Sequence, residues 1–129
     1  KITANGEDNN VAALFDGDFS TRWSTEETTD ENDLQNGRIT LHFIGDQNVA
    51  WVKIAFFDGH LAHQHFSLYK ESAAASEWTP VLQYANAQTT ESFQTYDIDE
   101  TGVNKLYIVA NGNDVGHFTK VSEVEAWGC

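Results

Sequence analysis

A series of short apolar runs, each separated from the next by turn residues, constrains the fold more than any other feature of the chain. The segment RITLHFIG (38–45) alternates Ile39, Leu41 and Phe43 with polar neighbours, which is typical of a strand with one buried face. Sustained helical spacing is almost absent, although AAASE (73–77) is a candidate for a helical turn. We expect strands over 38–45, 49–59, 65–72, 77–84, 92–98, 105–112 and 120–128.

Strands at this regular spacing predict an all-β fold, either an antiparallel β-sandwich or a jelly roll. With 129 residues, of which 40% are hydrophobic, the chain is long enough for one domain with a core and too short for a second. We therefore expect a single domain over 1–129. No run is apolar enough to cross a bilayer and no cleavable leader is visible, so we expect a soluble chain from which any secretion signal has been removed.

The charge balance excludes two classes of partner. Twenty acidic residues against seven basic ones give a net charge of −13. This charge would repel duplex nucleic acid and anionic membranes, so we expect neither as a partner. It also suits a protein kept soluble in salt water, where ions screen self-repulsion, and so favours a marine source. The single cysteine, Cys129, can form no internal disulfide, and its position suggests a cut from a longer chain.

An oxygen-rich loop, NVAALFDGDFSTRWS (10–24), precedes the first clear strand. Carboxylates, hydroxyls and bent backbone carbonyls are the ligands that Ca²⁺ requires, six to eight of them at about 2.3 to 2.6 Å. The spacing is not that of an EF-hand, because Thr21 occupies the place where that loop requires glycine and no helices flank it. Two interpretations remain: a calcium site, or a turn in which Asp16 and Asp18 bond to backbone amides without a metal.

Residues for catalysis are not apparent. The chain has no Gly-x-Ser-x-Gly elbow, no His-Glu-x-x-His helix and no phosphate-binding glycine loop. His60, His63 and His65 fall close together, but no acidic or cysteine partner stands in a recognised zinc-ligand spacing, which disfavours a transition-metal site. The acidic stretch 24–37 is typical of a solvated surface. We therefore expect a domain that is not an enzyme.

Several segments occur in the order expected of a discoidin-like domain: ALFDGDFSTRWS, VKIAFF, HFSLYKES, EWTPV, LYIVANGN and SEVEAWG. Over essentially its whole length the chain resembles the coagulation-factor type C fold. It is most similar to family-32 carbohydrate-binding modules, particularly those attached to alginate lyases and related marine lyases. The resemblance implies a jelly roll of the galactose-binding-domain type.

This resemblance also implies a function. Such a domain is secreted and monomeric, and it holds a covalently linked polysaccharide lyase or glycoside hydrolase on its polymer, here alginate or another marine or galactose-containing polysaccharide. The same fold also serves discoidin-like adhesion domains that bind a protein or cell-surface partner, and this alternative stays open because fold alone does not define function.

The resemblance further implies a structural calcium ion that ties the early loop to the last strand. The implied ligands are the side chains of Asp16, Thr21 and Glu123 and the carbonyls of Ala13 and Asp18. Trp23 is expected to fill the core, and Arg22 to satisfy buried acceptors.

In this family sugars bind to loops at one end of the sandwich. The loop over 58–65 and the loop before the last strand supply donors, amides and an aromatic ring. The corresponding candidates in this chain are His60, His63, His65, Asn111, Asn113, His117 and Phe118, with Glu26 at the border. Each histidine alone is equally consistent with an exposed loop residue, and Phe118 with a core aromatic. The first loop lacks the arginine that many members carry, which leaves the identity of the sugar open.

Overall fold

The computed structural model describes residues 2–5, 23–26, 38–57, 63–90, 92–114 and 118–128. All regular secondary structure in these ranges is β-strand, as expected. The strands are β1 (Ile2–Asn5), β2 (Trp23–Glu26), β3 (Arg38–Phe56), β4 (Gln64–Ser72), β5 (Ala75–Asn86), β6 (Gln94–Asn113) and β7 (Phe118–Gly128). Within the same ranges we find no helix with the length and apolar character needed to traverse a bilayer.

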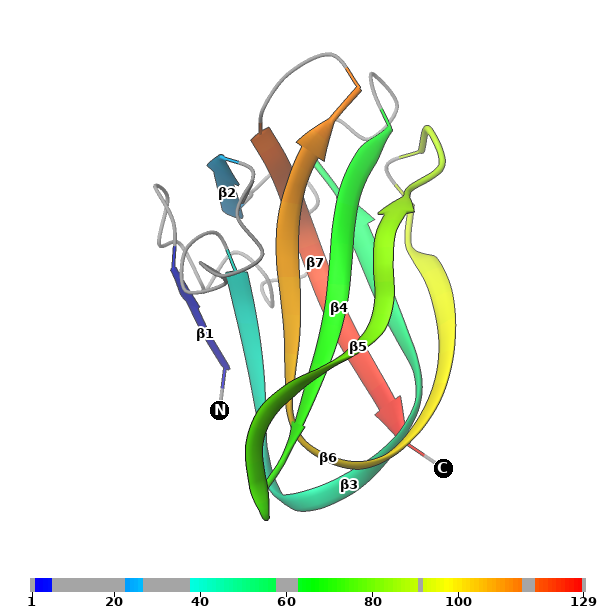
Figure 1. Cartoon of the computed structure of the whole chain (residues 1–129). Helices are drawn as coiled ribbons and strands as arrows, with labels where there is room; N and C mark the ends of the chain where they lie inside the picture. Colours follow the sequence, from blue (N-terminus) through cyan, green and yellow to red (C-terminus); the bar gives the residue numbers. More distant parts are fainter. Residues whose placement is uncertain are drawn as a thin grey trace.

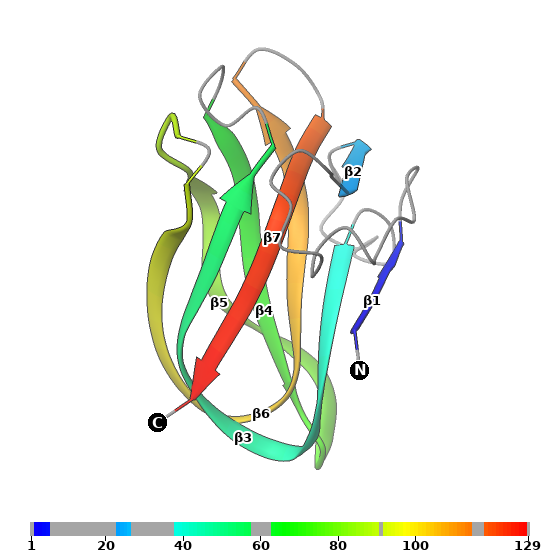
Figure 2. The ribbon, with the colours of Figure 1, turned by 180° about the vertical axis from the view of Figure 1, so that it is seen from behind.

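Two strands belong to both layers of the sandwich. β3 and β6 have 19 and 20 residues, far more than an ordinary strand. The front layer in Figure 1 contains β1, the first part of β3, the second part of β6, β4 and β5. The back layer, seen in Figure 2, contains the first part of β6, the second part of β3, β7 and β2. Because every pair is antiparallel, the chain forms an antiparallel β-sandwich.

Left-handed backbone conformations mark the places where β3 and β6 bend between the layers. Gly45 has a φ of +69° and Gly102 a φ of +65°. The register between the two strands also shifts here, between His42 and Gln47. Glycine adopts positive φ without the steric penalty of a Cβ atom, and an irregular register increases the local bend. The two strands therefore turn together from one layer into the other.

The core lies between the layers and takes side chains from both. Phe66 of the front layer contacts two aromatic rings of the back layer, Phe56 at 5.5 Å and Tyr96 at 4.9 Å between ring centroids. Trp23 is 1% exposed, which confirms that its ring fills the core. Other fully buried members are Ile39, Val52, Ile54, Leu68, Leu106, Ile108 and Val121.

The expected strands from residue 38 onward are confirmed, but two boundaries between them are wrong. Residues 38–45 and 49–56 lie in the single strand β3, and residues 94–98 and 105–112 lie in β6. Residue 57 is a turn, and residues 58 and 59 lie outside the described residues. A pause in the apolar alternation looks the same whether a strand ends or bends, so the sequence pattern did not distinguish the two. The helical turn over 73–77 is also wrong, because residues 73 and 74 form the turn of the β4–β5 hairpin.

Replacing Gly102 with alanine should lower the free energy of unfolding by about 1 to 2 kcal/mol, measured by chemical denaturation. No atom lies within 4 Å of the position that a Cβ would take, so the loss would come from backbone conformation and not from a clash. Gly102→Asn is the matched variant, because asparagine tolerates the left-handed region, and it should lose less. An alanine variant as stable as the original chain would contradict the role assigned to this bend.

Candidate functional site

Three segments that are distant in sequence meet at one end of the sandwich, uppermost in Figure 1. They are the start of β4, the end of β5 and the end of β6. The carbonyl of Gln64 accepts a hydrogen bond from Ala87 N at 2.8 Å, and the carbonyl of His63 accepts one from Asp114 N at 3.2 Å. His63 N in turn donates to Asp114 Oδ1 at 3.1 Å. We call this region the loop end.

Two buried polar side chains hold the strands together at the loop end. Thr119, 1% exposed, accepts a hydrogen bond from Gly112 N at 2.8 Å, and its hydroxyl lies 3.1 Å from the carbonyl of His65. Gln64, 2% exposed, accepts through Oε1 from Lys120 N at 3.0 Å. Buried backbone groups need such partners because water does not reach them. Thr119 and Gln64 thereby join β4, β6 and β7 and fix the strand ends from which the loops emerge.

His63 is exposed and has a defined ring orientation. Its Nδ1 lies 2.6 Å from the carbonyl oxygen of Ala87. A carbonyl can only accept a hydrogen bond, so Nδ1 carries the hydrogen and, in the neutral ring, Nε2 is an acceptor. His63 can therefore accept a hydrogen bond from a hydroxyl group through Nε2.

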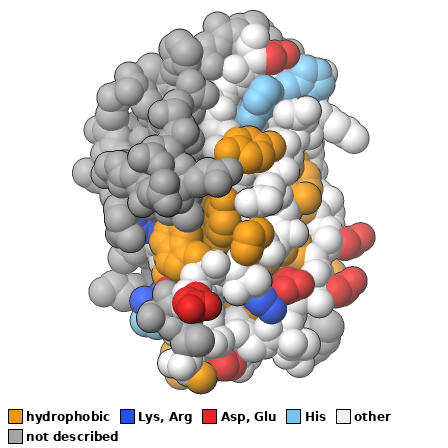
Figure 3. Space-filling view, viewed as in Figure 1, with side chains coloured by type: hydrophobic (Ala, Val, Ile, Leu, Met, Phe, Trp, Pro, Cys, Tyr) orange, Lys and Arg blue, Asp and Glu red, His pale blue; other side chains and the backbone are white. Residues whose placement is uncertain are grey.

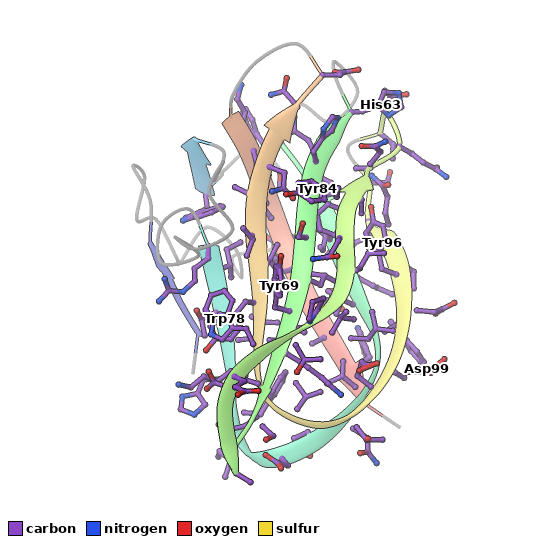
Figure 4. All side chains as sticks on the ribbon, viewed as in Figure 1. His63, Tyr69, Trp78, Tyr84, Tyr96 and Asp99 are labelled. Atoms are coloured by element: carbon purple, nitrogen blue, oxygen red, sulfur yellow. The ribbon has the colours of Figure 1, made fainter. Side chains whose placement is uncertain are left out.

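A chain of hydrogen bonds links the backbone of Tyr84 to the side-chain amide of Asn111 below the loop end. Ser67 Oγ donates to Asn111 Oδ1 at 2.6 Å and accepts from Tyr84 N at 3.0 Å. Because the Asn111 oxygen accepts from Ser67, the orientation of the amide is fixed and its nitrogen, a hydrogen-bond donor, points away from Ser67. Figure 4 shows Tyr84 and His63 at the same end of the sandwich.

Tyr84 combines two unusual properties. Its backbone has a φ of 52°, and its side chain is 59% exposed. Positive φ is unfavourable for a bulky residue, and the exposure leaves part of the ring accessible to a ligand. The conformation arises where β5 has an extra residue relative to β4, between the pairs Phe66–Ala85 and Leu68–Leu82. An exposed aromatic ring and a fixed amide are the kinds of group that bind a sugar, which presents an apolar ring face and a set of hydroxyls.

A rigid aromatic cluster lies farther along the outer face of the front layer. Trp78 stacks on Tyr107 with 3.7 Å between ring centroids and contacts Tyr69 at 5.8 Å. Burial raises the pKa of Tyr107 to about 12, and the nearby Glu71 also contributes. The phenol therefore stays protonated at neutral pH and donates to Glu71 Oε1 at 3.1 Å. Figure 3 shows hydrophobic side chains gathered on this face, with histidines nearer the loop end.

The structure brings some of the predicted sugar-site residues together. His63 and Asn113 lie at adjacent strand ends, since Gln64, the residue after His63, pairs with Asn113. Asn111 is two residues before Asn113 on β6 and therefore lies on the same face of the sheet. His65 is half-buried and pairs with Asn86 of β5. Glu26 and Phe118 are register partners in the β2–β7 pair. The rest of the acidic stretch, residues 27–37, lies outside the described residues. His60 and His117 lie outside the described residues.

Sequence analysis missed Tyr84. The pattern of residues 77–84 predicts an ordinary strand end, and an extra residue in one strand leaves no trace in apolar alternation. An exposed tyrosine at the end of a strand is common, so only the partner strand identifies the irregular backbone and the outward ring.

The predicted calcium ligands are only partly described. Glu123 of β7 is buried, with 6% exposure. β2 begins at Trp23, which pairs with Val121, two residues from Glu123. Ala13, Asp16, Asp18 and Thr21 lie outside the described residues, in the segment that precedes β2. Within the ranges that the structure describes, no three His, Cys, Asp or Glu side chains gather as a metal site.

No protein-family model and no curated protein sequence matches this chain. Several solved structures, however, are similar to this chain. The family-32 carbohydrate-binding module of AlyQ, in complex with 4,5-unsaturated mannuronic acid, is 24% identical with a TM-score of 0.82, over 100% of this chain and 95% of that chain. A pectin-binding carbohydrate-binding module is 19% identical with a TM-score of 0.78, over 98% and 88%. A family-32 module of a Clostridium perfringens family-89 glycoside hydrolase is 12% identical with a TM-score of 0.73, over 100% and 93%.

Some of these neighbours are parts of enzymes. A truncated AlyQ with both a family-32 module and an alginate lyase domain is 25% identical, and this chain covers 31% of it. These similarities confirm at the level of the fold the resemblance that the sequence motifs indicate. The chain has the jelly-roll fold of family-32 carbohydrate-binding modules.

Replacing Thr119 with valine should lower the free energy of unfolding by about 1 to 3 kcal/mol, because the N–H of Gly112 loses its buried acceptor while side-chain volume is kept. Urea denaturation measures the loss. Thr95→Val is the matched control, since Thr95 is exposed on a strand, and it should change stability by less than about 0.5 kcal/mol. Equal losses in both variants would show that Thr119 does not tie the strand ends together.

Proposed function

We propose that this domain is a non-catalytic carbohydrate-binding module that holds a secreted polysaccharide-degrading enzyme on its polymer. The observation that carries the proposal is the exposed ring of Tyr84, whose backbone N–H bonds the same Ser67 hydroxyl as the side-chain amide of Asn111, on a fold that carbohydrate-binding modules share. The ring offers a stacking surface, and the amide and His63 offer a donor and an acceptor for hydroxyls.

The ligand class follows from hydrogen bonding more than from charge. The described part of the loop end presents His63, Asn111 and Asn113, and its nearest carboxylate is Asp114. A net charge of −13 adds no attraction for a polyanion. Stacking and hydroxyl recognition would therefore carry the affinity, with alginate or another marine or galactose-containing polysaccharide as the ligand. A single shallow site of this kind binds weakly, and tethering to the enzyme compensates by raising effective concentration.

We also propose a structural calcium ion that joins the early loop to β7. Glu123 would supply a carboxylate, Asp16 and Thr21 side-chain oxygens, and Ala13 and Asp18 carbonyl oxygens, a donor set of the hard oxygens that Ca²⁺ prefers. Support comes from the burial of Glu123 and from the pairing of β2 with β7, which brings the chain that follows the early loop within two residues of Glu123. The ion would stabilise the fold and take no part in sugar recognition.

Binding to alginate, agarose, carrageenan, ulvan and galactan should identify the polymer, by affinity electrophoresis and by calorimetry with oligosaccharides. Tyr84→Ala should weaken binding to that polymer about tenfold or more, which is about 1.4 kcal/mol, because the stacking surface is lost. Asn111→Ala and His63→Ala should weaken it as well.

The matched control is His42→Ala, an exposed histidine on β3 away from the loop end, and it should bind like the original chain. Retention on none of the polymers by a folded domain with calcium present would contradict the proposal and favour the protein-adhesion alternative. Retention unaffected by the three site variants would place the sugar elsewhere on the domain.

Removing calcium with a chelator should lower the melting temperature, because an ion bound only to the folded state stabilises it by about 2.7 kcal/mol at a concentration 100 times its dissociation constant. Glu123→Gln should reduce the calcium-dependent shift. Glu125→Gln, on the same strand, is the matched control and should keep it. A melting temperature independent of calcium in the original chain would contradict the metal site.

A further inference from the structure

A hollow of about 300 Å³ opens at the end of the sandwich opposite the loop end, between the bend of β3 and the end of β7. Phe43 and Val49 contribute apolar walls, and Ile44 and Trp127 line it as well. Ile44 is 95% exposed and Trp127 is 47% exposed. Two of the three large hydrophobic side chains that the described residues expose therefore border this one hollow, which marks it as a binding surface.

The indole of Trp127 is held rigidly by three contacts. Trp51 stacks near it with 6.4 Å between centroids and 20° between planes, and the Lys53 ammonium lies 5.9 Å from its ring centroid. Its Nε1 donates to Glu125 Oε1 at 2.9 Å. None of these three partners lines the hollow. The indole therefore presents a fixed surface to the hollow, which lowers the entropy cost of stacking a ligand on it.

Two amides supply hydrogen-bonding groups beside the indole. Gln47 Nε2 donates to the carbonyl of Ile44 at 2.8 Å, so Gln47 Oε1 is oriented as an acceptor. Asn48, which also lines the hollow, has an exposed side chain that can donate and accept. An aromatic surface with neutral donors and acceptors at its edge matches a sugar ring, whereas an apolar protein side chain would leave these amides without partners.

The charges around the hollow disfavour an anionic ligand. Among the described residues no charged side chain lines it, although the chain as a whole carries −13. Lys53 and Glu125, which touch the indole from outside the hollow, have opposite charges. The described lining is thus neutral, and Asp46, between the lining residues Ile44 and Gln47, adds to the negative field of the chain, which opposes both a uronate and a second copy of this chain.

We propose that this hollow is a second carbohydrate site, separate from the loop end, that takes one uncharged sugar ring stacked on Trp127. The affinity of this hollow for a sugar does not depend on the loop-end site. The choice of a sugar as its ligand rests on the proposed function of the domain. A domain with sites at both ends can contact two chains of a polymer, or two domains of an array, and so increase retention through multivalency.

The test is an NMR titration of the ¹⁵N-labelled domain with neutral trisaccharides of galactose, glucose and mannose, and in parallel with an alginate trisaccharide. We expect at least one neutral trisaccharide to shift the indole N–H signal of Trp127 and the side-chain amide signals of Gln47 and Asn48. The alginate trisaccharide should leave these three signals unchanged. Trp127→Ala should abolish the shifts of Gln47 and Asn48 without altering any shifts of Asn111.

A second variant, Asn48→Ala, changes an exposed side chain and keeps the test valid if Trp127→Ala unfolds; it should weaken the neutral sugar at least threefold at the hollow. Shifts confined to Asn111 and its neighbours would overturn the second site and leave the loop-end site standing. Shifts confined to the hollow would support the second site and count against the proposed loop-end site. No shift at the hollow with any neutral sugar, or shifts there that depend on protein concentration without sugar, would overturn the proposal.

Discussion

The antiparallel pairing of β3 with β6 is the interaction on which the rest of the structure depends. The pair runs from Arg38–Val109 to Ile54–Gln94 and passes through both layers of the sandwich. In the front layer β1 and β4 pair with one half of this pair, and in the back layer β7 pairs with the other half. The core therefore forms only when the pair bends, because the bend brings the inward faces of its two halves opposite each other. Gly45 and Gly102 provide the backbone freedom for that bend.

Different residues satisfy the hydrogen bonds of the backbone at the two ends of the sandwich. At the bend the strands continue through the turn, and side-chain amides bond the carbonyls that leave the ladder: Asn104 Nδ2 donates to Phe43 O and Gly45 O at 3.3 Å, and Gln47 Nε2 donates to Ile44 O at 2.8 Å. At the loop end β4, β5, β6 and β7 all terminate, and the backbone groups there need side-chain partners. Thr119, Gln64 and Ser67 meet that need while buried. Their hydrogen bonds offset the cost of desolvating these side chains, and those of Ser67 also hold the Asn111 amide and the backbone of Tyr84 in place.

The sequence predicts the architecture well because apolar alternation depends only on which face is buried. Ile39 and Leu41, or Leu106 and Ile108, show that face directly. It predicts strand ends poorly, since a bend at Gly102 and a loop look alike. It brings His63, Asn111 and Asn113 forward as candidates because their loops were expected at one end, and the structure places them there. It does not find Tyr84 or the Trp127 hollow, because each depends on a partner strand: the extra residue opposite β4 in one case, and the end of β7 beside the bend of β3 in the other.

The distribution of charge leaves aromatic stacking as the main source of affinity in the proposed sugar binding. Of the few cations in the chain, Lys70 pairs with Glu100 at 2.8 Å and Lys105 with Glu71 at 3.4 Å, so both serve the fold. The Lys53 ammonium lies over the ring of Trp127, so this cation contacts an aromatic ring within the fold. The described surface thus offers little cationic charge for a polyanion, and screened long-range repulsion leaves only short-range contacts to discriminate between ligands. For such a surface the exposed rings, Tyr84 at one end and Trp127 at the other, are where affinity can arise, and the neighbouring amides are where one sugar can be distinguished from another.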